Sequence, residues 1–331
     1  MSESLKAHPL LRQWLGLGTT GQVQALSGKV DLGQGISHAL RLIVAQELRL
    51  SPSLIDMVPA STHTSPDEAV TSGSLSVQHS GAALRCAAAH WRELCRFEMA
   101  KRCGVNVAAV LCVNSEFSVQ EKNQTASYAE LTSAEMWQST IDTTHVQSPH
   151  AAQDTDASQA KPTALRPDVA SKVFGEFEYI HDRVLPNMCH GMVFRPGTLT
   201  AEVIASDMQA LVHHVQAQSG VLHVHQDGLL LGVLTDTEYA LSKIVKHIED
   251  GVTQGKFWRC HAEVPDANDL SNWLKAQPLD TTVVADITSE APTNVVQYLK
   301  AEFHRPYVQH ASIGLCCALA QWTDDAQQLE V

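Results

Sequence analysis

A polar segment in the middle of the chain limits what this sequence can fold into. Across residues 142–161, Thr, Gln, Ser, Ala, Asp and His predominate, and almost no bulky apolar residue occurs. Such a segment cannot bury enough apolar surface to offset the entropy lost on ordering. We therefore expect a linker at 146–164, which separates a first domain at 1–145 from a second at 165–255, with a further segment at 256–331.

The size and charge of the chain restrict its partners. With 331 residues, 44% of them hydrophobic, it can form two or three globular units. The net charge of -13 argues against nucleic acid or an anionic membrane surface as the main partner. The sequence contains no apolar run of membrane-spanning length and no secretion signal at its start, so we expect a cytoplasmic location, with the periplasm as the alternative.

The first candidate site is a glycine turn. A strand expected over residues 22–30 leads to Gly33, Gln34 and Gly35, and apolar residues at helical spacing follow from Ile36. Backbone N–H groups at the start of a helix favour anions, and the Gln34 amide can both donate and accept. A tight strand-to-helix connection without a ligand is the more ordinary explanation of such a turn.

The second candidate site precedes a long helix, which apolar spacing predicts over residues 81–103. Residues 70–76 offer several hydroxyls and small side chains, which would let a planar ligand approach the backbone. The alternative is that Thr71 or Ser74 caps the helix and that the remainder is an ordinary loop.

The later sequence predicts a small mixed α/β domain. We expect strands at 173–179 and 192–195, and a hairpin around Asp227 and Gly228. Thr235 and Glu238 have the spacing of a capping box in front of an amphipathic helix. A short helix is expected near 270–276, and a strand-like alternation follows over 294–303.

The histidines and cysteines give no pattern of metal ligands. His213 and His214 are neighbours on an expected helix and diverge, whereas His223 and His225 share a strand face without a Cys or carboxylate at ligand spacing. The eight cysteines include no C-x-x-C pair or ferredoxin spacing. We therefore assign no metal ligand to this chain. Because the sequence also contains no G-x-S-x-G, no Walker-type loop and no paired-carboxylate motif, we assign no catalytic residue to it.

Four ordered segments carry a family resemblance. Residues 28–36, GKVDLGQGI, are similar to a G-K-V-E-L-G-Q-G-I motif, and residues 71–84 to a T-A-G-S-x-S helix entry. Residues 170–196 and the RPYVQHASIG segment at 305–314 also match. Together they resemble molybdopterin-binding large subunits of the xanthine dehydrogenase/aldehyde oxidase family, especially the isoquinoline 1-oxidoreductase and nicotinate dehydrogenase branch. Asp31 replaces a glutamate, and Leu315, Cys316 and Cys317 replace P-S-C.

The resemblance implies an α+β fold: part of a molybdopterin-binding α/β domain, a small "hammerhead" α/β domain at 165–255, and the truncated start of a second molybdopterin-binding segment at 256–331. It also implies roles for particular residues. Gly33, Gln34 and Gly35 would hold the pterin or its phosphate, and His310 and Gly314 would lie on the substrate side. The surroundings of the molybdenum and pterin would be lined by Ser72, Gly73, Ser74 and Ser76.

The implied activity is that of a molybdenum hydroxylase, which adds water-derived oxygen to an N-heteroaromatic or aldehyde substrate. Gly314 stands where purine and aldehyde enzymes commonly carry glutamate, which favours an N-heteroaromatic substrate. The cofactor would be molybdenum-molybdopterin, with the cytosine dinucleotide form as one option. A chain carrying the C-terminal half would supply the catalytic base, a [2Fe-2S] subunit would remove electrons, and this chain would be inactive alone. The alternative is a non-catalytic remnant, or an assembly or binding module of the same fold.

Overall fold

The structure, a computed structural model, divides the chain into two compact units, residues 1–177 and 178–331. It describes residues 2–113, 116–146, 165–198, 200–261 and, between 265 and 331, all except 267, 279, 286–293, 295–296, 298, 302, 307, 309–311, 313 and 324–326. Most of the expected linker, 147–164, lies outside the described residues. Residues 165–177, expected in the second domain, cluster with the first unit.

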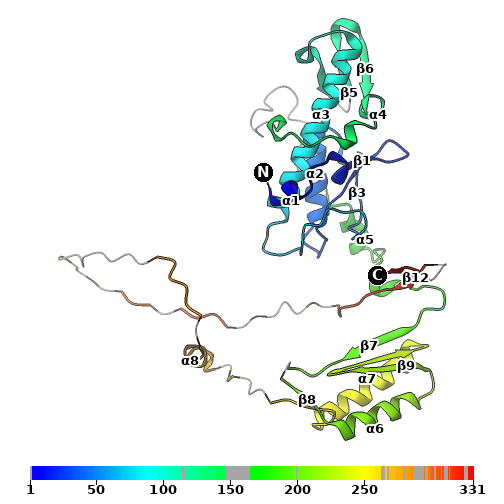
Figure 1. Ribbon diagram of the computed structural model, residues 1–331, viewed down its shortest axis with the longest axis vertical. Helices are drawn as coiled ribbons and strands as arrows, with labels where there is room; N and C mark the ends of the chain where they lie inside the picture. Colours follow the sequence, from blue (N-terminus) through cyan, green and yellow to red (C-terminus); the bar gives the residue numbers. More distant parts are fainter. Residues whose placement is uncertain are drawn as a thin grey trace. The chain divides into compact units, whose positions relative to one another are not determined.

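The first unit combines helices with two small sheets (Figure 1). In one sheet β2 pairs antiparallel with β1 and parallel with β3, and the other is the antiparallel order β4-β5-β6. The helices are α1 (Glu3–Ala7), α2 (Ile36–Leu48), α3 (Ala82–Cys103), α4 (Tyr128–Leu131) and α5 (Asp168–Val173). The strands are β1 (Leu15–Leu17), β2 (Val23–Ala25), β3 (Ile55–Met57), β4 (Leu111–Val113), β5 (Glu116–Val119) and β6 (Gln124–Ser127).

The core of the first unit forms where α2 and α3 pack together. Apolar residues at helical spacing place Leu40 on α2, and Leu84 and Trp91 on α3, at full burial. Arg92 on α3 ties the same two helices by an ion pair with Glu47, whose Oε1 lies 2.6 Å from its Nη1. The predicted long helix is therefore confirmed, and it anchors the segments that precede α2 and α3.

The second unit is built around an antiparallel sheet of order β7-β10-β9, against which α6 and α7 lie side by side (Figure 1). The strands of this unit are β7 (His190–Phe194), β8 (Glu202–Val203), β9 (Val221–Asp227), β10 (Leu230–Thr235), β11 (Trp258–Arg259), β12 (Gln321–Trp322) and β13 (Leu329–Glu330). Its helices are α6 (Ala205–Gln216), α7 (Glu238–Thr253) and α8 (Leu270–Lys275). The mixture of helices and strands in both units is that of the α+β class.

Several local predictions can be compared with the second unit. The hairpin around Asp227 and Gly228 is confirmed by the pairing of β9 with β10. The predicted capping box is wrong, because Thr237 caps α7 by accepting from Ala240 N, whereas the hydroxyl of Thr235 donates to carbonyls of His190 and Thr237.

Other expected strands differ from the structure. The strand expected at 173–179 is wrong, because α5 runs to Val173 and the residues after it form a turn and irregular backbone. The strand expected over 22–30 ends at Ala25. In the predicted strand at 294–303 only some residues are described, and these lie outside any strand.

Candidate functional site

The glycine turn, residues 31–35, is folded around the carboxylate of Asp31. Gly33 and Gly35 have positive φ angles of 95° and 77°, which favour glycine because a Cβ is strained there. Asp31 Oδ1 accepts from Gly33 N at 2.9 Å and from Gly35 N at 3.3 Å, and Oδ2 accepts from Ser37 N at 3.4 Å. The backbone amides that we expected to bind an anion therefore already bind the Asp31 carboxylate.

Gln34 and Arg166 hold the same turn from two sides. The exposed Gln34 side chain donates from Nε2 to Val30 O at 3.1 Å and accepts from Leu32 N. Arg166 Nη1 donates to Gly33 O at 3.2 Å. The side-chain hydrogen bond with Arg166, together with Lys172, holds the pKa of the Asp168 carboxyl well below its ordinary range. These contacts leave one amide hydrogen of Gln34 for another partner.

The serine loop, residues 71–76, is more open. Gly73 and Ser74 both have positive φ, 66° and 57°, and a serine in this region is uncommon. Among the described residues, the hydroxyls of Ser72, Ser74 and Ser76 have no hydrogen-bond partner, and Ser72 and Ser74 are exposed. This loop therefore presents unused donors and acceptors.

The capping alternative for this loop is wrong. A π-helical turn (Val77–Gly81) precedes α3, and Gly81 stands at the N-cap without a side-chain hydrogen bond. Thr71 instead accepts a hydrogen bond from Val30 N through its Oγ1, at 3.0 Å. The threonine thus joins the serine loop to the segment that leads into the glycine turn.

Further contacts hold these two segments together. Lys29 Nζ donates to the carbonyls of Glu68 and Val70, the latter at 3.0 Å. A Cβ on Gly28 would lie 2.3 Å from Pro66 O, so only glycine allows the backbones to come this close. The residues predicted from the sequence for the two loops, Gly33, Gln34, Gly35, Ser72, Gly73, Ser74 and Ser76, therefore extend from adjoining segments of one unit.

Glu68 is a site residue that sequence reasoning missed. Its side chain is buried at 8% exposure, and Oε2 accepts from Ser27 Oγ and Gly28 N, both at 3.0 Å, and from Ser80 Oγ. An acidic residue within a polar loop ordinarily faces water, so the sequence carried no signal for this burial.

Of the two residues predicted for the substrate side, the structure describes Gly314, which lies in the second unit. Gly314 lies beside His181, whose Cε1 would be 3.4 Å from a Cβ at that glycine, and the His181 ring contacts Leu315 O at 2.8 Å through Nε2. His310 lies outside the described residues.

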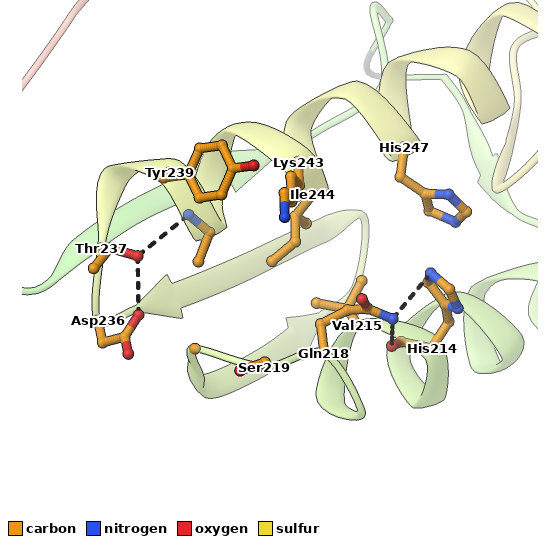
Figure 2. A pocket seen from close by; sticks show the side chains of 12 residues that line it. His214, Val215, Gln218, Ser219, Asp236, Thr237, Tyr239, Lys243, Ile244 and His247 are labelled. Carbon is orange, nitrogen blue, oxygen red and sulfur yellow. Dashed lines mark hydrogen bonds between the residues drawn. The ribbon is translucent and has the colours of Figure 1, made fainter.

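A hollow of about 320 Å³ lies elsewhere in the second unit, between α6 and α7 (Figure 2). At one end the rings of His214 and His247 stack with centroids 4.4 Å apart, and the pKa of His247 is lowered by partial burial and, to a smaller extent, by His214. Asp236, Thr237, Tyr239 and Lys243 also line it, and all these polar side chains are exposed. It is a shallow surface depression without a buried polar anchor.

The described part of the chain offers neither a metal centre nor a membrane span. No three of its His, Cys, Asp or Glu side chains gather in a way that could hold a metal ion. None of its helices has both the length and the apolar character needed to cross a bilayer.

The comparisons with known proteins show which proteins this chain resembles. Residues 8–170, which include both loops, match the family model of the molybdopterin cofactor-binding domain. Over 329 residues the chain is 29% identical to a nicotinate dehydrogenase subunit of Pseudomonas putida, covering 95% of this chain and 26% of that protein. The chain is thus similar to molybdopterin-binding subunits of the xanthine dehydrogenase family, and it spans about a quarter of the length of this curated relative.

Solved structures give a weaker match. A Cu,Mo-CO dehydrogenase in the carbon monoxide reduced state and a reconstituted CO dehydrogenase from Oligotropha carboxidovorans each show 26% identity. Each match covers 35% of this chain and 15% of the other, with a TM-score of 0.32.

Proposed function

We propose that this chain supplies part of the molybdopterin cradle of a molybdenum hydroxylase and is inactive alone. The observation that carries the proposal is the joining of the two loops at their bases by the Val30–Thr71 hydrogen bond, within the segment that matches the cofactor-binding family. One loop would present unpartnered hydroxyls, and the other a glutamine amide, to the same ligand.

The residues of the two loops would bind different parts of the cofactor. Ser72, Ser74 and Ser76 would donate to polar atoms around the pterin and metal, and Gly73 would let the ligand approach the backbone. In the glycine turn, Gln34 would use its remaining amide hydrogen, while the amides of Gly33 and Gly35 would reach a phosphate only if Asp31 moved away. When bound, the molybdenum centre supplies the two-electron chemistry that oxidises an activated C–H carbon with oxygen from water.

A companion polypeptide is part of the proposal. Apolar side chains on and beside both loops are exposed: Val30, Leu32, Val70, Leu75 and Val77. Several exposed apolar side chains on two adjoining segments favour a contact with another polypeptide segment. We assign that contact to a chain carrying the C-terminal half of the large subunit, which would also supply the catalytic base.

The remaining parts of the assembly are proposed from the similarity to this family. The second unit would be the hammerhead domain, and Gly314, with His310, would face an N-heteroaromatic or aldehyde substrate, with an N-heteroaromatic one favoured over a purine. Electrons would leave through a [2Fe-2S] subunit, the pterin would carry a cytosine dinucleotide as one option, and the complex would work in the cytoplasm, with the periplasm as the alternative.

One observation favours a second candidate, a binding or assembly module without cofactor. The Asp31 carboxylate satisfies the turn amides, so the glycine turn is complete without any ligand. The hydroxyls of the serine loop favour the cofactor-binding role, because a scaffold does not need them.

The two candidates differ in the composition of the purified protein. The chain is isolated with its companion chains from molybdenum-supplied cells, and metal and pterin are measured by mass spectrometry and by pterin fluorescence. The cofactor role predicts both in near-equal amounts with the chain. A complex that contains every companion but neither molybdenum nor pterin would leave only the assembly role.

A further inference from the structure

The buried carboxylate of Glu68 links three segments that border the proposed cofactor cradle. Through Oε2 it joins Ser27 and Gly28, which follow β2, to Ser80, which lies in the π-helical turn before α3. Glu68 itself stands just before the serine loop. Glu68 and Ser80, which flank that loop on its two sides, are thereby fixed to the segment that leads into the glycine turn.

Lys29 adds further hydrogen bonds between the same two segments, with the side chain now on the segment that leads into the glycine turn. Its side chain is buried, at 7% exposure, and Nζ donates to the backbone carbonyls of Glu68 and Val70. Its own backbone N donates to Ser27 Oγ at 3.0 Å. We call these side chains and backbone groups, Ser27, Gly28, Lys29, Glu68 and Ser80, the Glu68 cluster.

The cluster is polar where an apolar core would suffice for stability. Burying charged groups is costly unless they are hydrogen-bonded, and Glu68 Oε1 is buried without any partner among the described residues. Apolar packing would hold two backbones together but would leave their register loose, whereas three donors converging on one oxygen fix it. The unfavourable free energy of burying these polar groups is explained if the cluster sets the spacing of the two loops.

Resting on the proposed function, we propose that Glu68 and Lys29 are positioning residues that set the spacing between the glycine turn and the serine loop. Neither contacts the ligand in this account. They act through the segments 27–30 and 68–71, which carry Gln34 and Ser74 toward one cradle.

Glu68→Ala tests the proposal, with Glu93→Ala as its matched control. Glu93 is a second buried carboxylate of the same unit, which pairs with Arg92 and Arg96 on α3 and contacts neither loop. Hydrogen exchange of amides in residues 31–35 and 71–76 reports the order of the loops, and pterin per folded chain reports binding. Both are measured on the complex with its companion chains.

Glu68→Ala is expected to speed exchange in both loops, and to lower pterin occupancy, by about fivefold or more, since it removes the shared acceptor of three donors. Glu68→Gln keeps an acceptor oxygen and should recover part of both losses. Glu93→Ala should lower overall stability while leaving loop exchange and pterin per folded chain as in the wild type. Should Glu68→Ala fail to fold, Ser80→Ala, which removes one donor, is expected to give a smaller effect in the same direction.

The outcomes separate this inference from the proposed function. If the wild type contains pterin and the Glu68 and Ser80 variants keep both their pterin and their slow exchange, the positioning role is wrong. If the wild type contains no pterin, the proposed function fails, and the exchange measurement alone decides whether the Glu68 cluster orders the loops.

Discussion

The close approach of Gly28 to Pro66 yields a prediction about stability. In Gly28→Ala the new Cβ would lie 2.3 Å from Pro66 O and 3.1 Å from Glu68 N. Carbon and carbonyl oxygen normally stay about 3.3 Å or more apart, so the two segments would have to separate by about 1 Å. That shift would stretch the bond from Gly28 N to Glu68 Oε2, which is 3.0 Å long. Overpacking and a weakened hydrogen bond together should cost about 2–4 kcal/mol.

Gly18→Ala is the matched control, because its Cβ would meet Gln22 O at an ordinary 3.6 Å. We expect it to change stability by no more than about 1 kcal/mol, because the substitution mainly restricts the unfolded chain. Hydrogen exchange of core amides in α3 measures the unfolding free energy of the first unit separately from that of the second. If Gly28→Ala were as stable as Gly18→Ala, the close contact between Gly28 and the Pro66 segment would be refuted.

Three further predictions concern buried groups. Arg92→Ala should destabilise the first unit by about 3–5 kcal/mol in urea denaturation, because it leaves the Glu47 carboxylate without its partner; a loss below about 1 kcal/mol would contradict the buried ion pair. Burial raises the pKa of Cys95 to about 12, so at pH 8 iodoacetamide should label exposed Cys260 readily and Cys95 only after unfolding, as peptide mass spectrometry would show. Burial lowers the pKa of His90 below its ordinary value, so the unfolded chain binds the proton more readily. The stability from this group is present above the unfolded pKa of about 6.5 and is lost as pH falls, so His90→Gln should flatten the fall in melting temperature below that pH.

Local pattern was enough to predict elements whose side chains contact each other within a short stretch. The β9–β10 hairpin follows from the turn preference of Asp227 and Gly228, and α3 from apolar spacing that survives over its full length. The strand expected at 173–179 does not form, because no sheet pairs with these residues, and Val173 and Phe174 stay exposed. The absence of a pairing partner in the tertiary structure, and not local strand propensity, determined the conformation of that segment.

The candidate site was less accessible to sequence reasoning. The two loops were found separately, from glycines and hydroxyls before helices, but their juxtaposition depends on the Val30–Thr71 bond between residues 41 positions apart. The Asp31 carboxylate in the turn amides and the burial of Glu68 depend on backbone conformations that no local pattern specifies. These contacts alter the expected chemistry, because they assign the free donors to the serine loop.

The claim that both loops form one cofactor site is tested most directly by pterin occupancy in Gln34→Ala, Ser74→Ala and the double variant, each purified with the companion chains. Because both side chains are exposed, the variants should fold as the wild type does. One shared site predicts that each single variant lowers pterin and molybdenum together, and that the double variant loses more than either. Full occupancy in one single variant beside a loss in the other would show that only one loop binds the cofactor.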